Sequence, residues 1–189
     1  LFTGLIVTPS NFVFVNKEGQ RFVNEFESRD VLSKAALEQK DGIFYIIADA
    51  NIKALAMNTT EDKINQELED GTLVKADTLE ALAQKLNIDT TTFVNTIERY
   101  NTFVEQGQDE DFNKNAFDLK IEKAPFYATP RKPAIHHTMG GLKINTQAQV
   151  IDVEGHIIEG LYAAGEVAGG IHAGNRLGCL LYTSDAADD

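Results

Sequence analysis

The N-terminal part of the chain alternates short apolar runs with polar turns, a pattern typical of β-strands. Residues 12–15 form an apolar run of β-type side chains, a polar turn follows at 17–20, and the pattern resumes at 21–23. This arrangement predicts a hairpin. A further apolar run at 43–47 has the composition of a buried strand.

A first helix is predicted directly after the hairpin. Asp30 is a residue type that caps helices, and it precedes a stretch that is expected to be helical from Val31 to about Lys40. The apolar residues of this stretch are expected to leave a polar opposite face: Val31, Leu32, Ala35 and Leu37. This region therefore predicts an amphipathic helix.

Two further helices have clear start signals. Thr78 is expected to cap a short helix over 79–86, and Asp89 or Thr90 begins the clearest helix of the chain. Apolar residues recur in the latter at helical spacing: Phe93, Ile97, Tyr100 and Val104. Its aromatic series, Phe93, Tyr100 and Phe103, is expected in the core, and the acidic run 109–111 is expected to be a solvated turn.

Composition changes after Pro125, where glycine-rich turns begin to separate β-type runs. These runs cover 141–145, 150–153 and 157–163. The middle of the chain, roughly 30–125, thus reads as a compact α+β unit. The two flanks read as pieces of another domain.

Charge excludes some classes of partner. The chain of 189 residues has a net charge of -12 and a hydrophobic fraction of 43%. Such a charge argues against sequence-independent binding to nucleic acid or anionic lipid, and no apolar run approaches the ~20 residues needed to span a bilayer. If such an acidic protein binds an anionic substrate, its few Arg and His residues must gather at the binding site.

The two ends of the chain lead to separate expectations. Because the chain starts at Leu1 rather than Met, it is expected to be an internal fragment of a longer protein. Residues 179–189, which include the single cysteine Cys179, resemble the translation of an adapter used in DNA library preparation. We expect this tail to be no part of the fold, with a real acidic C-terminus as the alternative.

Three segments carry candidate chemistry, while dinucleotide fingerprints, P-loops and metal-ligand spacings are missing from the sequence. They are Arg29-Asp30, the run His-His-Thr-Met-Gly-Gly at 136–141, and 160–178, which contains Ala-Ala-Gly-Glu and Gly-Asn-Arg-Leu-Gly. Small residues let a backbone approach a flat cofactor, Glu166 could accept a hydrogen bond from a hydroxyl, and Arg176 could bind a carboxylate in a bidentate fork. Each residue has a structural alternative: Arg29 as a surface residue, the His pair in a turn, Arg176 in a salt bridge and Glu166 as a helix cap.

Taken together, these motifs resemble fumarate reductase and flavocytochrome c flavoproteins. Residues 15–25, which lead to Arg29-Asp30, are similar to the entry of that family into its capping domain. The resemblance implies an α+β fold that combines a capping domain with flanking pieces of an FAD-binding Rossmann-type domain. The implied boundaries are 1–29 for part of the FAD-binding domain and the entry to the cap, 30–130 for the capping domain, 131–178 for the C-terminal part of the FAD-binding domain, and 179–189 for the tail.

The resemblance also implies a reaction and roles for five residues. Reduced FAD passes a hydride to one carbon of an activated C=C bond, and Arg29 delivers a proton to the other. His136 and Arg176 match residues that hold the substrate carboxylate, and His137 and Glu166 match contacts to FAD. The implied partners are a small unsaturated carboxylate and an electron-donor domain or protein, whose haem or FMN would lie outside this chain.

The sequence departs from the fumarate reducers of the family upstream of Arg29. Where those proteins have a Glu and an Arg that feed protons to the acid, this chain has Leu5 and Thr8, and nearby substrate-lining positions hold Phe2 and Gly4. Urocanate, methacrylate or cinnamate-type acids are therefore alternative substrates. A non-catalytic remnant, a succinate dehydrogenase-type subunit and a ketosteroid dehydrogenase relative remain alternative classes.

Overall fold

The structure is a computed structural model that describes residues 5, 8–56, 60–135 and 138–170. The chain divides into two compact units, Leu1–Pro133 and Ala134–Asp189. Each unit is described by itself.

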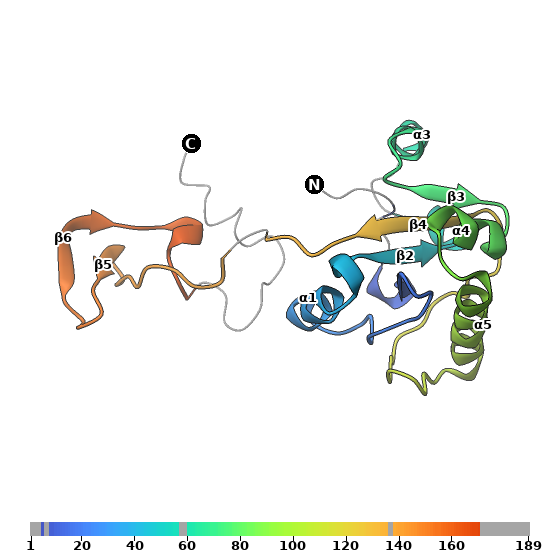
Figure 1. The fold of residues 1–189 in the computed structure, drawn as a ribbon. Coiled ribbons are helices and arrows are strands. Elements are labelled where there is room, and N and C mark those ends of the chain that lie inside the picture. Colours follow the sequence, from blue (N-terminus) through green and yellow to red (C-terminus); the bar gives the residue numbers. More distant parts are fainter. Residues whose placement is uncertain (1–4, 6–7, 57–59, 136–137, 171–189) are drawn as a thin grey trace. The chain divides into compact units, whose positions relative to one another are not determined.

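An antiparallel sheet forms the centre of the first unit. Its four strands follow the order β1-β2-β4-β3 and are β1 (Phe14–Asn16), β2 (Phe44–Ala48), β4 (Phe126–Arg131) and β3 (Val74–Ala76). The central pair β2 and β4 places Ile46 opposite Thr129. Figure 1 shows these strands side by side. The buried strand predicted at 43–47 is thus confirmed as β2.

The predicted hairpin is present as a tight turn after β1. Val15 bridges to Arg21 in antiparallel fashion. The side-chain Oδ1 of Asn16 accepts hydrogen bonds from the backbone N–H groups of Glu18 and Gln20, at 3.1 and 2.9 Å. Gly19 has φ of 81°, a conformation that favours glycine.

The described part of the first unit also contains the helices α1 (Arg29–Leu37), α2 (Ala50–Ala54), α3 (Glu61–Glu69), α4 (Leu79–Leu86) and α5 (Thr90–Gln106). Two predicted caps are confirmed, because Thr78 Oγ1 accepts from the N–H of Ala81 at 3.1 Å and Asp89 Oδ1 accepts from that of Thr92 at 2.8 Å. Helix α4 packs against α5 and against β3 and β4 (Figure 1).

Helix α1 differs from its prediction at both ends and in its inward face. Ser28, not Asp30, is the N-cap, and the helix ends at Leu37, because a 3-10 turn with Asp41 at φ 60° follows. Its inward-facing residues are Leu32, Ala35 and Ala36, at the i, i+3, i+4 spacing of one helix face. The predicted inward positions Val31 and Leu37 are 40% and 63% exposed.

The core of the first unit confirms the predicted aromatic series. Phe93, Tyr100 and Phe103 are buried, and Val104 packs partly against the same core. A second cluster beneath α1 is built on Phe14 and Phe44, whose ring centroids lie 4.7 Å apart.

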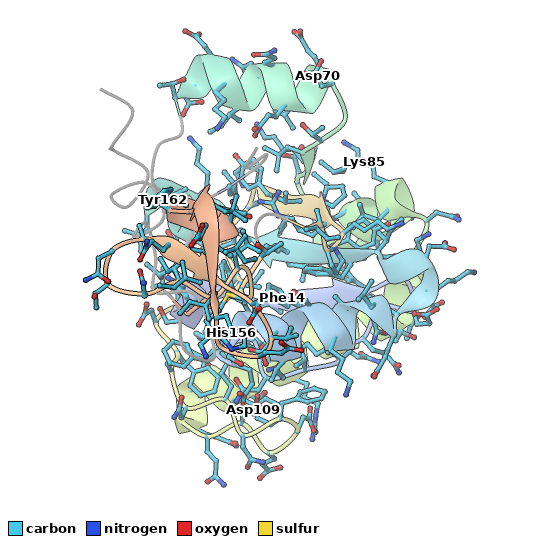
Figure 2. All side chains as sticks on the ribbon, turned by 90° about the vertical axis from the view of Figure 1, so that its left-hand side faces the viewer. Phe14, Asp70, Lys85, Asp109, His156 and Tyr162 are labelled. Atoms are coloured by element: carbon cyan, nitrogen blue, oxygen red, sulfur yellow. The ribbon has the colours of Figure 1, made fainter. Side chains whose placement is uncertain are left out.

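The second unit contains the antiparallel pair β5 (Gln149–Ile151) and β6 (Ile157–Tyr162) and a short 3-10 turn at Gly165–Val167. The runs predicted at 150–153 and 157–163 are confirmed as strands, whereas 141–145 forms only isolated bridges. Figure 2 labels His156, directly before β6, and Tyr162, the last residue of that strand. Every residue of β6 is exposed. Among the helices of the described residues, none is long and apolar enough to span a bilayer.

Candidate functional site

The structure describes two of the five predicted site residues. Arg29 lies in the first unit and Glu166 in the second. His136, His137 and Arg176 lie outside the described residues, as does the expected tail at 179–189. The convergence of the catalytic and substrate-binding residues therefore stays a prediction.

Arg29 is the first residue of α1 and is exposed. Next to it, the Ser28 hydroxyl donates to Oδ1 of Asp30 at 2.6 Å and holds the pKa of that carboxyl below its usual range. A cation in the first turn opposes the helix dipole, so the helix itself gains nothing from Arg29. An exposed guanidinium at this point is available to a ligand.

Glu166 connects two of the motifs singled out in the sequence. Its Oε1 accepts hydrogen bonds from the backbone N–H of Thr138 at 2.8 Å and from the Thr138 hydroxyl at 3.5 Å. The carboxylate is half-buried. Since an ionised carboxylate offers about four lone-pair sites, Glu166 keeps acceptor capacity for a ligand hydroxyl.

The same two segments meet along their backbones next to Glu166. Leu142 and Ala168 form a parallel bridge, in which the Leu142 N–H donates to Val167 O at 2.7 Å. A Cβ on Gly141 would lie 2.2 Å from Val167 O, and a Cβ on Gly169 would lie 2.9 Å from Gly141 N. Both positions therefore require glycine because the backbones are so close.

A buried cluster of charged residues, which we call the charge cluster, was missed in the sequence. Its members are Arg21, Glu25, Asp109 and Lys114, all with side chains at most 4% exposed. Arg21 binds Glu25 through Nε and Nη2 at 2.8 and 2.7 Å, and its Nη2 also lies 2.8 Å from Asp109 Oδ2. Asp109, in the loop after α5 (Figure 2), is buried, so the prediction of a solvated turn is wrong for this residue.

Burial and pairing shift the pKa values of the charge cluster. Burial disfavours the charged forms of both Arg21 and Asp109, but their pairing outweighs burial. The two carboxylate partners of Arg21 raise its pKa, and Arg21 together with backbone N–H groups lowers the pKa of Asp109. Burial lowers the pKa of Lys114 to about 8, although Glu25, 3.8 Å from its Nζ, offsets part of this effect. Burial also raises the pKa of Tyr100, whose ring lies beneath both cations.

Two cavities of the first unit are lined by residues other than Arg29. One of about 660 Å³ lies between β3 and α4 and is lined by Leu73, Ala81 and Lys85, among others. Another of about 430 Å³ opens beside Arg21 and Tyr100. Asp152, Glu154 and His156 come close together in the turn before β6, where they are held by turn hydrogen bonds to Asp152 Oδ1.

The family of the chain follows from comparison with known proteins. The family described as FAD binding domain matches residues 6–179. The chain belongs to this family. The structure of the open conformation of a flavocytochrome c3 fumarate reductase matches with a TM-score of 0.75 and 36% identity, over 95% of this chain and 32% of that chain. The resemblance to fumarate reductase and flavocytochrome flavoproteins, and the mixed α and β fold, are thus confirmed.

Relatives in this family carry the names of reductases. A protein of Vibrio harveyi named NADH:acrylate oxidoreductase is 60% identical over 94% of this chain and 18% of its own length. A urocanate reductase of Eggerthella lenta is 40% identical over 97% of this chain and 30% of its own length. The chain thus spans less than a third of the length of these two relatives.

A solution NMR structure helps to delimit the shared region. It is that of a fumarate reductase flavoprotein subunit from Lactobacillus plantarum, with 25% identity and a TM-score of 0.54. The match covers 69% of this chain and 88% of that chain. The region shared with this chain therefore makes up most of the chain in the solution structure.

Proposed function

We propose that the full-length protein is an FAD-dependent oxidoreductase that reduces the C=C bond of a small unsaturated carboxylate. The observation that carries the proposal is the bond between Thr138 and Glu166, because it unites the two motifs on which the resemblance depends. The names of the relatives support the reaction class, since they include reductases of acrylate, urocanate and fumarate.

Within this class, we favour an acrylate-type monocarboxylate as substrate. The relative at 60% identity is named for acrylate, whereas the one named fumarate reductase (cytochrome), from Shewanella frigidimarina, is 39% identical. The upstream positions agree with this choice. Leu5, where fumarate reducers have a proton-relaying Glu, is 2% exposed and packs in the core, so its surroundings suit an apolar side chain.

The described part of the second unit fits FAD. Glu166 retains acceptor capacity for a hydroxyl, and the exposed Ala164 beside it has a side chain small enough for a flat ligand to come close to the backbone. His137 is proposed as a second contact. When bound and reduced by the electron donor, FAD would supply the hydride for the reduction.

The substrate roles follow the resemblance. His136 and Arg176 hold the carboxylate and oppose the charge that builds on it during reduction. Arg29 donates the proton to the second carbon, which its exposed position at the start of α1 allows. Because a guanidinium rarely gives up a proton, this step requires immediate re-protonation.

The domain assignment stays part of the proposal. Residues 30–130 act as the capping domain, and 1–29 and 131–178 belong to the FAD-binding domain or its junction with the cap. The exposure of all six residues of β6, which include Ile157, Leu161 and Tyr162, supports this assignment. Such an apolar strand is expected to pack against further parts of a larger domain.

The electron donor is proposed to act outside this chain. The name NADH:acrylate oxidoreductase points to NADH as the source of electrons in that relative. A donor domain with FMN or haem would then pass electrons to FAD. Oxidation of NADH by the full-length protein in the presence of acrylate tests this point separately.

The decisive experiment compares the full-length enzyme with its Arg29→Lys variant. Reduced viologen dye would supply electrons, and acrylate, fumarate, urocanate and cinnamate would be offered in turn. We expect turnover with acrylate, and a loss of kcat of about 10²–10⁴-fold in Arg29→Lys with a comparatively small change in KM.

Lys34→Gln is the matched control, because Lys34 is an exposed cation on the same helix. This control should keep the wild-type kcat. Near-normal kcat in Arg29→Lys would refute the proton-donor role. A wild-type enzyme that reduces none of the four acids would refute the proposed reaction.

A further inference from the structure

Glu25 lies at the centre of the charge cluster and only four residues before Arg29. Its Oε1 accepts hydrogen bonds from Arg21 Nε at 2.8 Å and from the backbone N–H of Phe14 at 3.2 Å. Its Oε2 binds Arg21 Nη2 at 2.7 Å. The side chain is 0% exposed, so Glu25 is a fixed point of the first unit.

A short, hydrogen-bonded turn connects this fixed point to α1. Asn24 Oδ1 accepts from the N–H of Phe26 at 2.9 Å, and Asn24 O accepts from the N–H of Glu27 at 3.2 Å. Asn24 Nδ2 donates to Asn113 O at 3.4 Å, close to the loop residues of the charge cluster. These bonds restrain the chain from Asn24 to Glu27, directly before the N-cap Ser28 of α1.

The inward face of helix α1 packs against the cluster built on Phe14 and Phe44. Ala36, in the last turn, is its one buried residue, and Leu32 and Ala35 are half-buried. These contacts hold the helix from the end of its first turn, at Leu32, to its last turn. Arg29, the first residue of the helix, lies before these contacts and directly after the N-cap Ser28, so the preceding segment also bears on its position.

We propose that Glu25 is a positioning residue for Arg29, which it places through Arg21, Asp109 and the Asn24 turn. This inference rests on the proposed function, because it assigns the charge cluster to the same reaction. A displacement of about 1 Å in a catalytic group can lower a rate by about 10²-fold. For that reason, the charge cluster that positions Arg29 has to be rigid.

A role in stability alone is the competing explanation. Buried ion pairs stabilise folds little compared with apolar side chains of similar volume, although removal of one partner is strongly destabilising. A purely structural Glu25 would therefore change the melting temperature and the yield. It would leave kcat per folded, flavin-loaded enzyme unchanged.

The test uses the full-length enzyme with Glu25→Gln, measured per bound flavin with acrylate and reduced viologen dye. We expect kcat to fall 10- to 100-fold while KM changes less than threefold. Glu105→Gln is the matched control, because it makes the same chemical change in an exposed ion pair with Lys120 and should leave kcat unchanged.

The decisive comparison is the double variant Glu25→Gln with Arg29→Lys, assayed by product accumulated over hours. If Glu25 acts through Arg29, the double variant is no slower than Arg29→Lys alone. Independent, multiplying losses, or an unchanged kcat in Glu25→Gln, would overturn the positioning role while the proposed function stands. No turnover by the wild type would overturn the proposed function and the positioning role together.

A second variant covers the case in which Glu25→Gln does not fold. Asn24→Ala removes the two side-chain hydrogen bonds of the turn, to Phe26 and Asn113, and leaves the buried charges in place, since Asn24 is only half-buried. It should show a smaller loss of kcat and the same lack of additivity with Arg29→Lys. Additive losses in this pair would count against the proposal in the same way.

Discussion

The backbone N–H of Thr138 donates a hydrogen bond of 2.8 Å to Oε1 of Glu166 and thereby joins two segments that are 28 positions apart. One segment follows the His pair, and the other holds the Ala-Gly-Glu motif. Because the bond uses one carboxylate oxygen, Glu166 can orient the first segment and still accept from a ligand. Flavin binding in the full-length protein should depend on this single side chain.

Substitution of Glu166 should lower the flavin content of the purified full-length protein. We expect Glu166→Ala to lose most of its FAD, because it removes both the bond to Thr138 and the acceptor for a hydroxyl. Glu166→Gln keeps one acceptor oxygen and should retain intermediate affinity for FAD. We expect its Kd for FAD to rise about tenfold, which corresponds to a loss of ~1.4 kcal/mol in binding free energy. Flavin absorbance after gel filtration measures this, and full occupancy in Glu166→Ala would contradict the assignment.

Gly141 should not tolerate a side chain, whereas its neighbour Gly140 should. A Cβ at 141 would lie 2.2 Å from Val167 O, while a Cβ at 140 meets nothing within 4 Å. We expect Gly141→Ala to destabilise the full-length protein by about 1–3 kcal/mol or more and to release flavin, because backbone must shift. Gly140→Ala is the control, and equal melting temperatures for the two variants would count against the close approach.

Asp49 should contribute more to stability than an ordinary helix cap. It is 0% exposed, and its carboxylate accepts from the N–H groups of Ile52, Glu122 and Lys123, at 2.9, 3.2 and 2.9 Å. Asp49→Ala would leave these donors without their partner, at a cost of about 2–4 kcal/mol. Asp89 is an exposed helix cap, so Asp89→Ala should lower the free energy of unfolding by only ~1 kcal/mol. Denaturant unfolding of both variants measures the difference. Similar losses in both variants would contradict this ranking.

The elements that could be predicted from the sequence depend on local signals. Thr78 and Asp89 cap their helices through groups three residues away, and the hairpin near Gly19 closes over a few residues. The start of α1 was misplaced because Ser28 and Asp30 are both good capping residues only two positions apart. Local chemistry alone does not choose between them.

The features that could not be predicted depend on partners far away in the chain. Strand β3 pairs with β4, with Val74 opposite Ala128. The local sequence of either short segment does not predict which strand it pairs with. Asp109 is buried because Arg21, 88 positions earlier, neutralises it. A run of acidic residues gives no sign of such a distant cation, so the charge cluster could not be found in the sequence.

The buried lysine of the charge cluster makes the stability of the first unit depend on pH. Burial lowers the pKa of Lys114 to about 8 in the folded protein, against roughly 10.4 for an unfolded chain. Between these values the unfolded state binds more protons, so stability should rise with pH, by about 2 kcal/mol from pH 8 to pH 10. The charged and titratable groups that face Lys114 are Glu25, Arg21, Asp109, Asp118 and Tyr100.

Urea unfolding of the chain at a series of pH values, compared with Lys114→Met, measures this dependence. The variant lacks the titrating amine, so the rise between pH 8 and pH 10 should be absent from it. Tyr100 limits the window from above, because its raised pKa makes the folded state retain a proton that the unfolded state loses beyond about pH 10. If the wild type and Lys114→Met have the same slope, Lys114 keeps its charge in the folded protein throughout this range, and the attraction of Glu25 and Asp109 outweighs burial.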